Sequence, residues 1–98
     1  MRFEDLKFEM SNMGFCGTIS RSHVEFPNGN GLSIVNGTYT YSGNGTYEIA
    51  PLFNGELKEI ESWGDSVRGY VSPEQITTIL EHAEKDSAEE YLKFLNDL

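Results

Sequence analysis

The side chains best suited to chemistry are one cysteine, Cys16, and two histidines, His23 and His82. They show neither the CxxC nor the HxxxH spacing that is typical of zinc sites, so we expect no metal ion and no cofactor. Cys16 and His23 could form a nucleophile–base pair, but a lone cysteine beside Phe15 is more typical of a small buried apolar side chain. The phosphate-binding patterns GxxxxGK[ST] and GxGxxG are absent. We therefore predict no catalytic residues and no enzyme.

Carboxylates dominate the charged residues, with 16 acids against 7 bases and a net charge of −9. Residues 56–98 hold eleven acids and four bases, a net charge of −7, whereas residues 1–55 are nearly balanced. Nucleic acids and anionic membranes select basic surfaces, so we expect neither as a direct partner. The acids of the C-terminal segment either form a solvated surface or contact a basic partner, and for the second role we name Glu81, Glu84 and Glu89.

Aromatic residues and one arginine supply further candidates for partner binding. Trp63 and Arg68 belong to residue types favoured at interface hot spots. Alternatively, Trp63 closes the core, and Asp65 forms a local ion pair with Arg68. Tyr39 and Tyr41 form either a cross-strand aromatic pair or rigid contact area for a partner. The partner-binding candidates are thus Tyr39, Tyr41, Trp63, Asp65, Arg68, Glu81, Glu84 and Glu89, whereas Tyr70 and Val71 are expected in the core.

The elements that must position these side chains begin with strands. Five Asn-Gly dipeptides separate apolar runs between residues 15 and 61, and Asn-Gly is the strongest short-range hairpin signal. The runs at 15–26, 32–35, 46–53 and, more weakly, 56–61 have strand composition. The sequence predicts the α+β class, with an antiparallel meander of four to five strands covered on one face by C-terminal helix.

Two positions limit this prediction. Pro51 has no backbone donor, so its strand is expected to lie at a sheet edge or to end there. Asn36-Gly37 interrupts the run from Leu32 to Tyr41, either as a bulge or as the end of the strand. We favour an end near Val35 and a loop over residues 37–43 that displays the two tyrosines.

The C-terminal segment carries clear helix signals. Ser72 is the expected N-cap, Pro73 the first helical residue and Gln75 the partner in a capping box. Apolar residues at helical spacing follow, first Ile76, Ile79, Leu80 and Ala83, then Tyr91, Leu92, Leu95 and Leu98. A second capping box at 87–90 allows a break near Asp86. The sequence therefore predicts either one long helix or two short ones.

Length and composition indicate one domain over residues 1–98, with the sheet in 1–71 and an acidic helical segment in 72–98. No apolar run approaches the roughly 20 residues that cross a bilayer, and the first residues do not resemble a signal peptide. A single cysteine suits a reducing compartment. We expect a cytoplasmic protein.

Three segments together carry a resemblance to a known group: Phe26-Pro27-Asn28-Gly29-Asn30-Gly31, Tyr47-Glu48-Ile49-Ala50-Pro51-Leu52 and Asp65-Ser66-Val67-Arg68-Gly69-Tyr70-Val71 before a capped helix. This order resembles that of small α+β proteins encoded by bacteriophages and prophages, over roughly residues 3–85. The matching segments are turn and strand signals, so the resemblance carries over no catalytic residue.

The resemblance implies a role in host takeover or anti-defence, as for anti-CRISPR proteins. We therefore expect a stoichiometric inhibitor in the bacterial host cytoplasm that binds a basic surface of a protein or ribonucleoprotein effector, such as a CRISPR–Cas complex. A second hypothesis is sequestration of a small nucleotide-like signal by the glycine-rich loops. A third is a structural, self-associating phage accessory protein. The sequence leaves the oligomeric state open.

Overall fold

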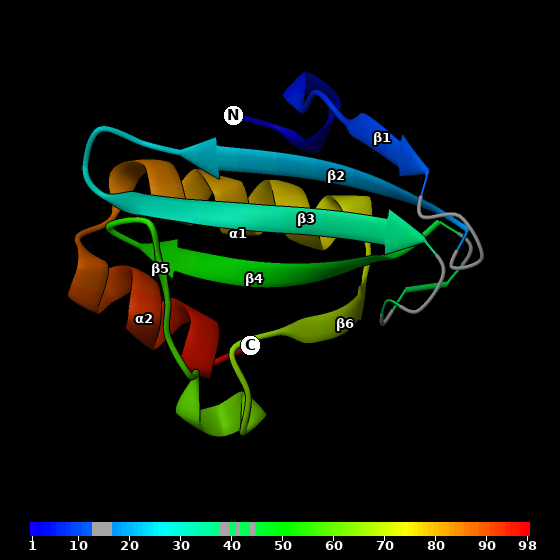
Figure 1. Cartoon of the computed structure of the whole chain (residues 1–98). Helices are drawn as coiled ribbons and strands as arrows, with labels where there is room; N and C mark the ends of the chain where they lie inside the picture. The colour runs from blue at the N-terminus through cyan, green and yellow to red at the C-terminus, as the bar shows by residue number, and fades with distance from the viewer. Residues whose placement is uncertain (13–16, 38–39, 41, 44) are drawn as a thin grey trace.

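The computed structural model describes residues 1–12, 17–37, 40, 42–43 and 45–98, which form an antiparallel sheet with two α-helices on one face (Figure 1). The sheet order is β1-β2-β3-β4-β5, and β6 also pairs with β4. This arrangement confirms the predicted α+β meander. The strands are β1 (Glu9–Asn12), β2 (Thr18–Glu25), β3 (Asn30–Gly37), β4 (Tyr47–Phe53), β5 (Glu56–Leu57) and β6 (Arg68–Val71).

Asn-Gly turns connect the strands at two of the predicted places. The turn between β2 and β3 has Gly29 at φ +93°, and its Phe26 N–H donates to the Asn30 carbonyl at 2.8 Å. Between β4 and β5, Asn54 and Gly55 have φ values of +54° and +80°, which Asn and Gly adopt at little steric cost. The local turn chemistry therefore sets the hairpins.

β3 ends at Gly37, where φ is +146°. Of residues 38–43, the structure describes Thr40, Ser42 and Gly43, and none of the three lies in a strand. For these residues the preferred end of the strand near Val35 agrees with the structure to within two residues. Tyr39 and Tyr41 lie outside the described residues, so their predicted display stays a prediction.

The prediction for Pro51 was wrong in one respect. β4 is an interior strand, because it pairs with β3 on one side and with β5 and β6 on the other. Pro51 lies opposite Leu32 of β3, but on the other side it falls between two pairings, Ile49 with Arg68 of β6 and Leu52 with Leu57 of β5. The gap between β5 and β6 accommodates a residue without a donor inside an interior strand.

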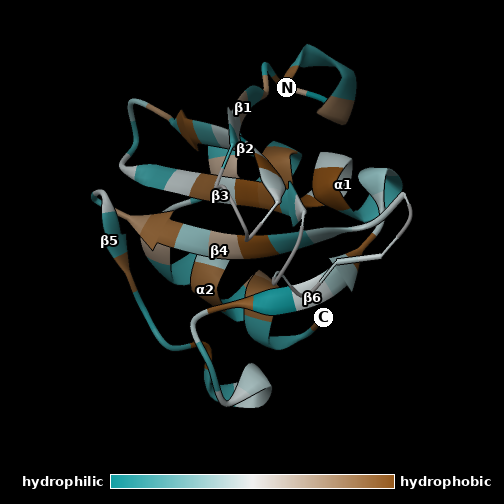
Figure 2. Ribbon diagram, turned by 45° about the vertical axis from the view of Figure 1, so that its right-hand side comes forward, coloured by the Kyte–Doolittle hydropathy of each residue, from teal (hydrophilic) through white to brown (hydrophobic). Residues whose placement is uncertain are grey.

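Two helices follow the sheet, which decides between the two alternatives. α1 (Pro73–Lys85) begins with the predicted capping box of Ser72 and Gln75, and α2 (Ala88–Asn96) begins with that of Ser87 and Glu90. Ser87 opens the second box directly after Asp86, whose backbone is extended, so the helix stops and restarts. In Figure 2 the ribbon of α1 alternates between hydrophobic and hydrophilic segments, as expected for a helix with one face on a sheet.

The core lies between the helices and one face of the sheet. Tyr91 and Leu95 of α2 complete it, as their spacing predicted. The buried hydrophobic residues that pack together are Leu32, Ile34, Ile49, Ile60, Val71, Ile76, Ile79, Leu80, Ala83, Tyr91 and Leu95. The other face of the sheet carries no helix (Figure 1).

The sequence did not predict β1 and β6 as strands. All four residues of β1 are exposed, so its sequence lacks the alternation of apolar and polar residues that marks a half-buried strand. β6 contains Gly69 and an irregular register with β4, both of which weaken a strand signal.

Candidate functional site

Trp63 and Arg68 form a corner beside the end of α2. Trp63 closes a short 3-10 helix, η3 (Glu61–Trp63), and its Nε1 donates to the Leu95 carbonyl at 3.1 Å. The Arg68 guanidinium lies 5.6 Å from the centroid of the Trp63 ring, within cation–π range. Trp63 is half-buried and its ring packs against the core, as expected if it closes the core. The rest of the side chain is exposed, as expected if it contacts a partner.

A hollow of about 420 Å³ opens at this corner. It is lined by Ser62, Trp63, Val67, Arg68 and Leu98. An Arg68 Nη1 lies 3.4 Å from a Leu98 backbone oxygen, and none of the ion pairs among the described residues involves the side chain of Arg68. The corner therefore offers one ring face and a guanidinium with spare donors, which suits a flat or carboxylate-bearing group.

The alternative of a local ion pair between Asp65 and Arg68 is not found among the described residues. Asp65 Oδ1 instead accepts a hydrogen bond of 2.6 Å from the Ser66 N–H, and the Asp65 backbone bridges to Ile60. These contacts hold the loop after η3 while Arg68 turns toward Trp63. Asp65 is exposed and belongs to the loop rather than to the corner.

The expectation of a core position was wrong for Tyr70 and correct for Val71. Val71 is 3% exposed, whereas Tyr70 is 65% exposed and has φ +58°, a left-handed conformation that is unusual for a bulky residue. The pairing of β4 with β6 explains the difference, because Tyr47 pairs with Val71 while Ile49 pairs with Arg68, so β6 holds one extra residue. This bulge turns the Tyr70 ring away from the core.

The predicted carboxylates are exposed but do not form one cluster. Glu81 and Glu84 lie on α1, and Glu89 lies in the first turn of α2. The N-terminal ammonium of Met1 pairs with Glu84, and together with Glu81 and Asp5 this carboxylate raises the pKa of the amine above its usual value. The structure describes no contact between these carboxylates and the Trp63–Arg68 corner.

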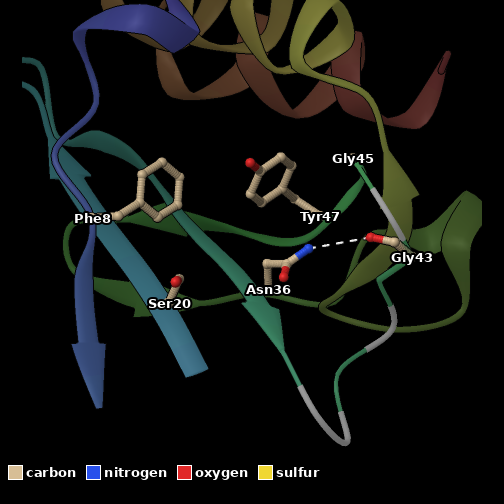
Figure 3. A pocket seen from close by; sticks show the side chains of 6 residues that line it. All are labelled: Phe8, Ser20, Asn36, Gly43, Gly45 and Tyr47. Atoms are coloured by element: carbon tan, nitrogen blue, oxygen red, sulfur yellow. Dashed lines mark hydrogen bonds between the residues drawn. The ribbon is translucent and has the colours of Figure 1, made fainter. Parts of the chain in front are cut away.

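A second cavity, of about 230 Å³, lies between the sheet and the segment that joins β3 to β4 (Figure 3). Its lining residues come from four chain segments: Phe8, Ser20, Asn36, Gly43, Gly45 and Tyr47. The rings of Phe8 and Tyr47 lie 5.6 Å apart, and Phe3 packs on both. Sequence reasoning missed this cavity because Phe8 and Asn36 are distant in sequence and carried no motif.

Asn36 closes the floor of this cavity. Its Nδ2 donates to the Thr46 carbonyl at 2.7 Å and to the Gly43 carbonyl at 3.3 Å. No hydrogen bond of its Oδ1, or of the Ser20 and Tyr47 hydroxyls, is found in the described part of the chain. The floor thus combines ring faces with polar atoms that a small planar ligand could use.

Two further observations bound the chemistry. Within residues 1–12, 17–37, 40, 42–43 and 45–98, no group of three or more His, Cys, Asp or Glu side chains is placed to hold a metal ion. Among the helices that the structure describes, none has the length and apolar character needed to cross a membrane. Comparison of the chain with models of protein families, with curated proteins and with solved structures finds no match.

Proposed function

We propose that this chain is a non-enzymatic, phage-encoded host-takeover or anti-defence protein in the bacterial cytoplasm. It binds a basic surface of a nucleic-acid-handling effector, such as a CRISPR–Cas complex, and inhibits it stoichiometrically. The phage origin derives from the resemblance of the three sequence segments. The binding role is supported by the acidic helices and the Trp63–Arg68 corner.

The observation that carries the proposal is that several carboxylates on the two helices are exposed and, within the described part of the chain, not paired with a basic group. Glu74, Glu81 and Glu89 are exposed, and none of them takes part in an ion pair found among the described residues. Carboxylates that are not neutralised within the molecule keep their field available to a basic partner and speed association. The same helices pack their apolar sides on the sheet, so the acidic residues can be substituted without disturbing the packing of the core.

The corner adds an aromatic anchor to the contact. Trp63 and Arg68 are preorganised by the Leu95 and Leu98 backbone at the end of α2, so little side-chain entropy is lost on binding. A bound surface would therefore include the exposed face of α1 and the first turn of α2, which carry the charge, with the aromatic anchor at the other end of α2.

Affinity capture from cells that express the defence system tests this proposal. The chain should recover one basic complex at stoichiometric yield, and recovery should fall as salt rises because exposed charges are screened. A triple variant, Glu74→Gln with Glu81→Gln and Glu89→Gln, should weaken capture, and Trp63→Ala should weaken it further.

The matched control carries the same change of net charge on strands and loops outside α1 and α2, as Glu9→Gln with Glu56→Gln and Glu59→Gln. Capture by the control should equal that of the unmodified chain. Equal capture by both triple variants would reject the acidic interface, and failure to recover any complex across several defence systems would reject the inhibitor function.

The cavity at Phe8 and Tyr47 supports a second candidate function, sequestration of a small nucleotide-like molecule. Its volume of about 230 Å³ is below the roughly 300–1,000 Å³ of ordinary ligand pockets, so it suits a single planar ring system. Thermal-shift measurements with nucleosides and cyclic nucleotides test this function. A stabilisation that is lost in Asn36→Ala supports it, and unchanged melting with every compound rejects it.

A further inference from the structure

The outer edge of β2 is only half covered. β1 pairs with Thr18–Arg21, whereas β2 continues to Glu25. In Figure 1 the arrowhead end of β2 has no strand on its outer side. An uncovered edge exposes backbone donors and acceptors that another strand can use.

The direction of each backbone group at this edge follows from the hairpin. Phe26 N–H donates to the Asn30 carbonyl, so residue 26 directs its backbone groups toward β3. Directions alternate along a strand, so Val24 also faces β3, and a Cβ at Gly31 would come within 2.5 Å of the Val24 carbonyl oxygen. His23 and Glu25 therefore direct their N–H and C=O groups to the open edge.

The chain that precedes β1 passes beside this edge without pairing with it, because the β1–β2 ladder ends at Glu9 and Arg21. The Phe3 N–H donates to Thr77 Oγ1 of α1 at 2.9 Å, which draws the N-terminal segment over the helix. Two hollows, of about 350 and 300 Å³, lie between this segment and the edge; Lys7, Ser22 and His23 line both, and the larger one is also lined by Met1, Asp5 and Leu6. Among the described residues, no strand pairs with the outer edge of residues 22–25.

We propose that this edge pairs with the same edge of a second copy of the chain. An antiparallel register with a two-fold axis at Val24 places His23 opposite Glu25 of the partner subunit, and Glu25 opposite His23 of the partner subunit. Both pairs are of the hydrogen-bonded kind, because these residues direct their backbone groups outward, so the pairing forms four backbone hydrogen bonds. The backbone donors and acceptors of this edge therefore match those of the same edge in a second copy.

The side chains fit the same register. His23 Nε2 and Glu25 Oε2 lie 3.1 Å apart within one strand. Both face away from the helices, because Val24 between them lies opposite the buried Leu32 and side chains alternate along a strand. In the dimer each histidine also faces a carboxylate across the two-fold axis, and opposite charges or a donor–acceptor pair at directly opposed positions stabilise a sheet.

This inference does not rest on the proposed function, and salt separates the two. Each copy carries a net charge of −9, so two copies repel and their association should strengthen as salt is added. Binding to a basic effector should weaken under the same change. The dimer can therefore be rejected without rejecting effector binding, and effector binding can be rejected without rejecting the dimer.

Sedimentation equilibrium from micromolar to millimolar concentration, at physiological and at raised salt, tests the dimer. Glu25→Lys should raise the dimer dissociation constant about tenfold or more, because each of the two symmetric pairs then loses the carboxylate that faces His23. The exchanged double variant, His23→Glu with Glu25→His, should restore association. Glu59→Lys changes the net charge equally in an exposed residue away from the edge and should dimerise at least as well as the unmodified chain, because it also lowers the repulsion between the two copies.

Amide hydrogen exchange supplies a readout at the edge itself. The amides of His23 and Glu25 should exchange rapidly in dilute monomer and become protected at high concentration, whereas Val24 stays protected throughout by its bond to β3. His23→Pro removes an outward donor without breaking the β2–β3 ladder and should abolish dimerisation. A chain that stays monomeric at millimolar concentration, or a dimer in which these two amides exchange freely, overturns the proposal.

Discussion

The hydroxyl of Tyr91 donates a hydrogen bond of 2.8 Å to the carbonyl of Gly31, across 60 residues of sequence. Tyr91 is 0% exposed and belongs to α2, whereas Gly31 lies in β3. This bond ties the second helix to the interior of the sheet, and the Phe53 ring packs 5.4 Å from the Tyr91 ring. α2 is therefore anchored to β3 by a buried polar contact in addition to its apolar packing.

Tyr91→Phe should lower the free energy of unfolding by about 1–2 kcal/mol, because it leaves the Gly31 carbonyl without its buried donor. Urea denaturation followed by circular dichroism measures this loss. Tyr47→Phe is the matched control, since no hydrogen bond of the Tyr47 hydroxyl is found in the described residues. Equal losses in both variants would contradict the role of the bond.

Burial also raises the pKa of the Tyr91 phenol above its usual value of 10.0. The folded chain therefore retains this proton at a pH where the unfolded chain releases it. The contribution to stability is fully present below pH 10 and is lost as the pH rises toward the folded pKa. Absorbance at alkaline pH should show one tyrosine that titrates only together with unfolding, and this tyrosine should be missing in Tyr91→Phe.

Asn30→Asp should destabilise the fold by about 2 kcal/mol or more. Asn30 Nδ2 donates to the carbonyls of Ala83 and Asp86, at the end of α1, and a buried carboxylate there would face acceptors only. Thermal unfolding across pH measures the effect. The defect should shrink at low pH, where the introduced acid is protonated and can donate; a defect that is constant with pH would contradict this explanation.

Tyr70→Gly should stabilise the fold by about 0.5–1 kcal/mol, because glycine adopts the φ of +58° without steric cost. Tyr70→Val should have the opposite effect, since a β-branched residue is strained in this conformation. Chemical denaturation of both variants gives the comparison. A loss of stability in Tyr70→Gly would show that the exposed ring makes a stabilising contact.

Gly31→Ala should cost about 2–3 kcal/mol, because the added methyl group would lie 2.5 Å from the Val24 carbonyl oxygen and force β2 and β3 apart. Gly64→Ala, where φ is +66° but no atom lies within 4 Å, should cost only about 1 kcal/mol. Melting temperatures of the two variants test this order. The reverse order would show that backbone conformation outweighs the close approach of the two strands.

Local chemistry was enough to predict much of the fold. The two capping boxes, the Asn-Gly turns and the helical spacing of Ile76, Ile79, Leu80 and Ala83 all act between residues close in sequence, so the sequence by itself determined these elements. Their type and order, together with the acidity of the exposed helix faces, required no knowledge of distant contacts.

Only the tertiary structure decided which distant residues meet. The tolerance of Pro51 depends on where β5 and β6 leave a gap, and the exposure of Tyr70 depends on a bulge against β4. The Phe8–Tyr47 cavity, the corner of Trp63 and Arg68 and the open edge at His23 likewise arise where separate segments come together or part. Register and packing depend on energies summed over the whole sheet, which no short stretch of sequence encodes.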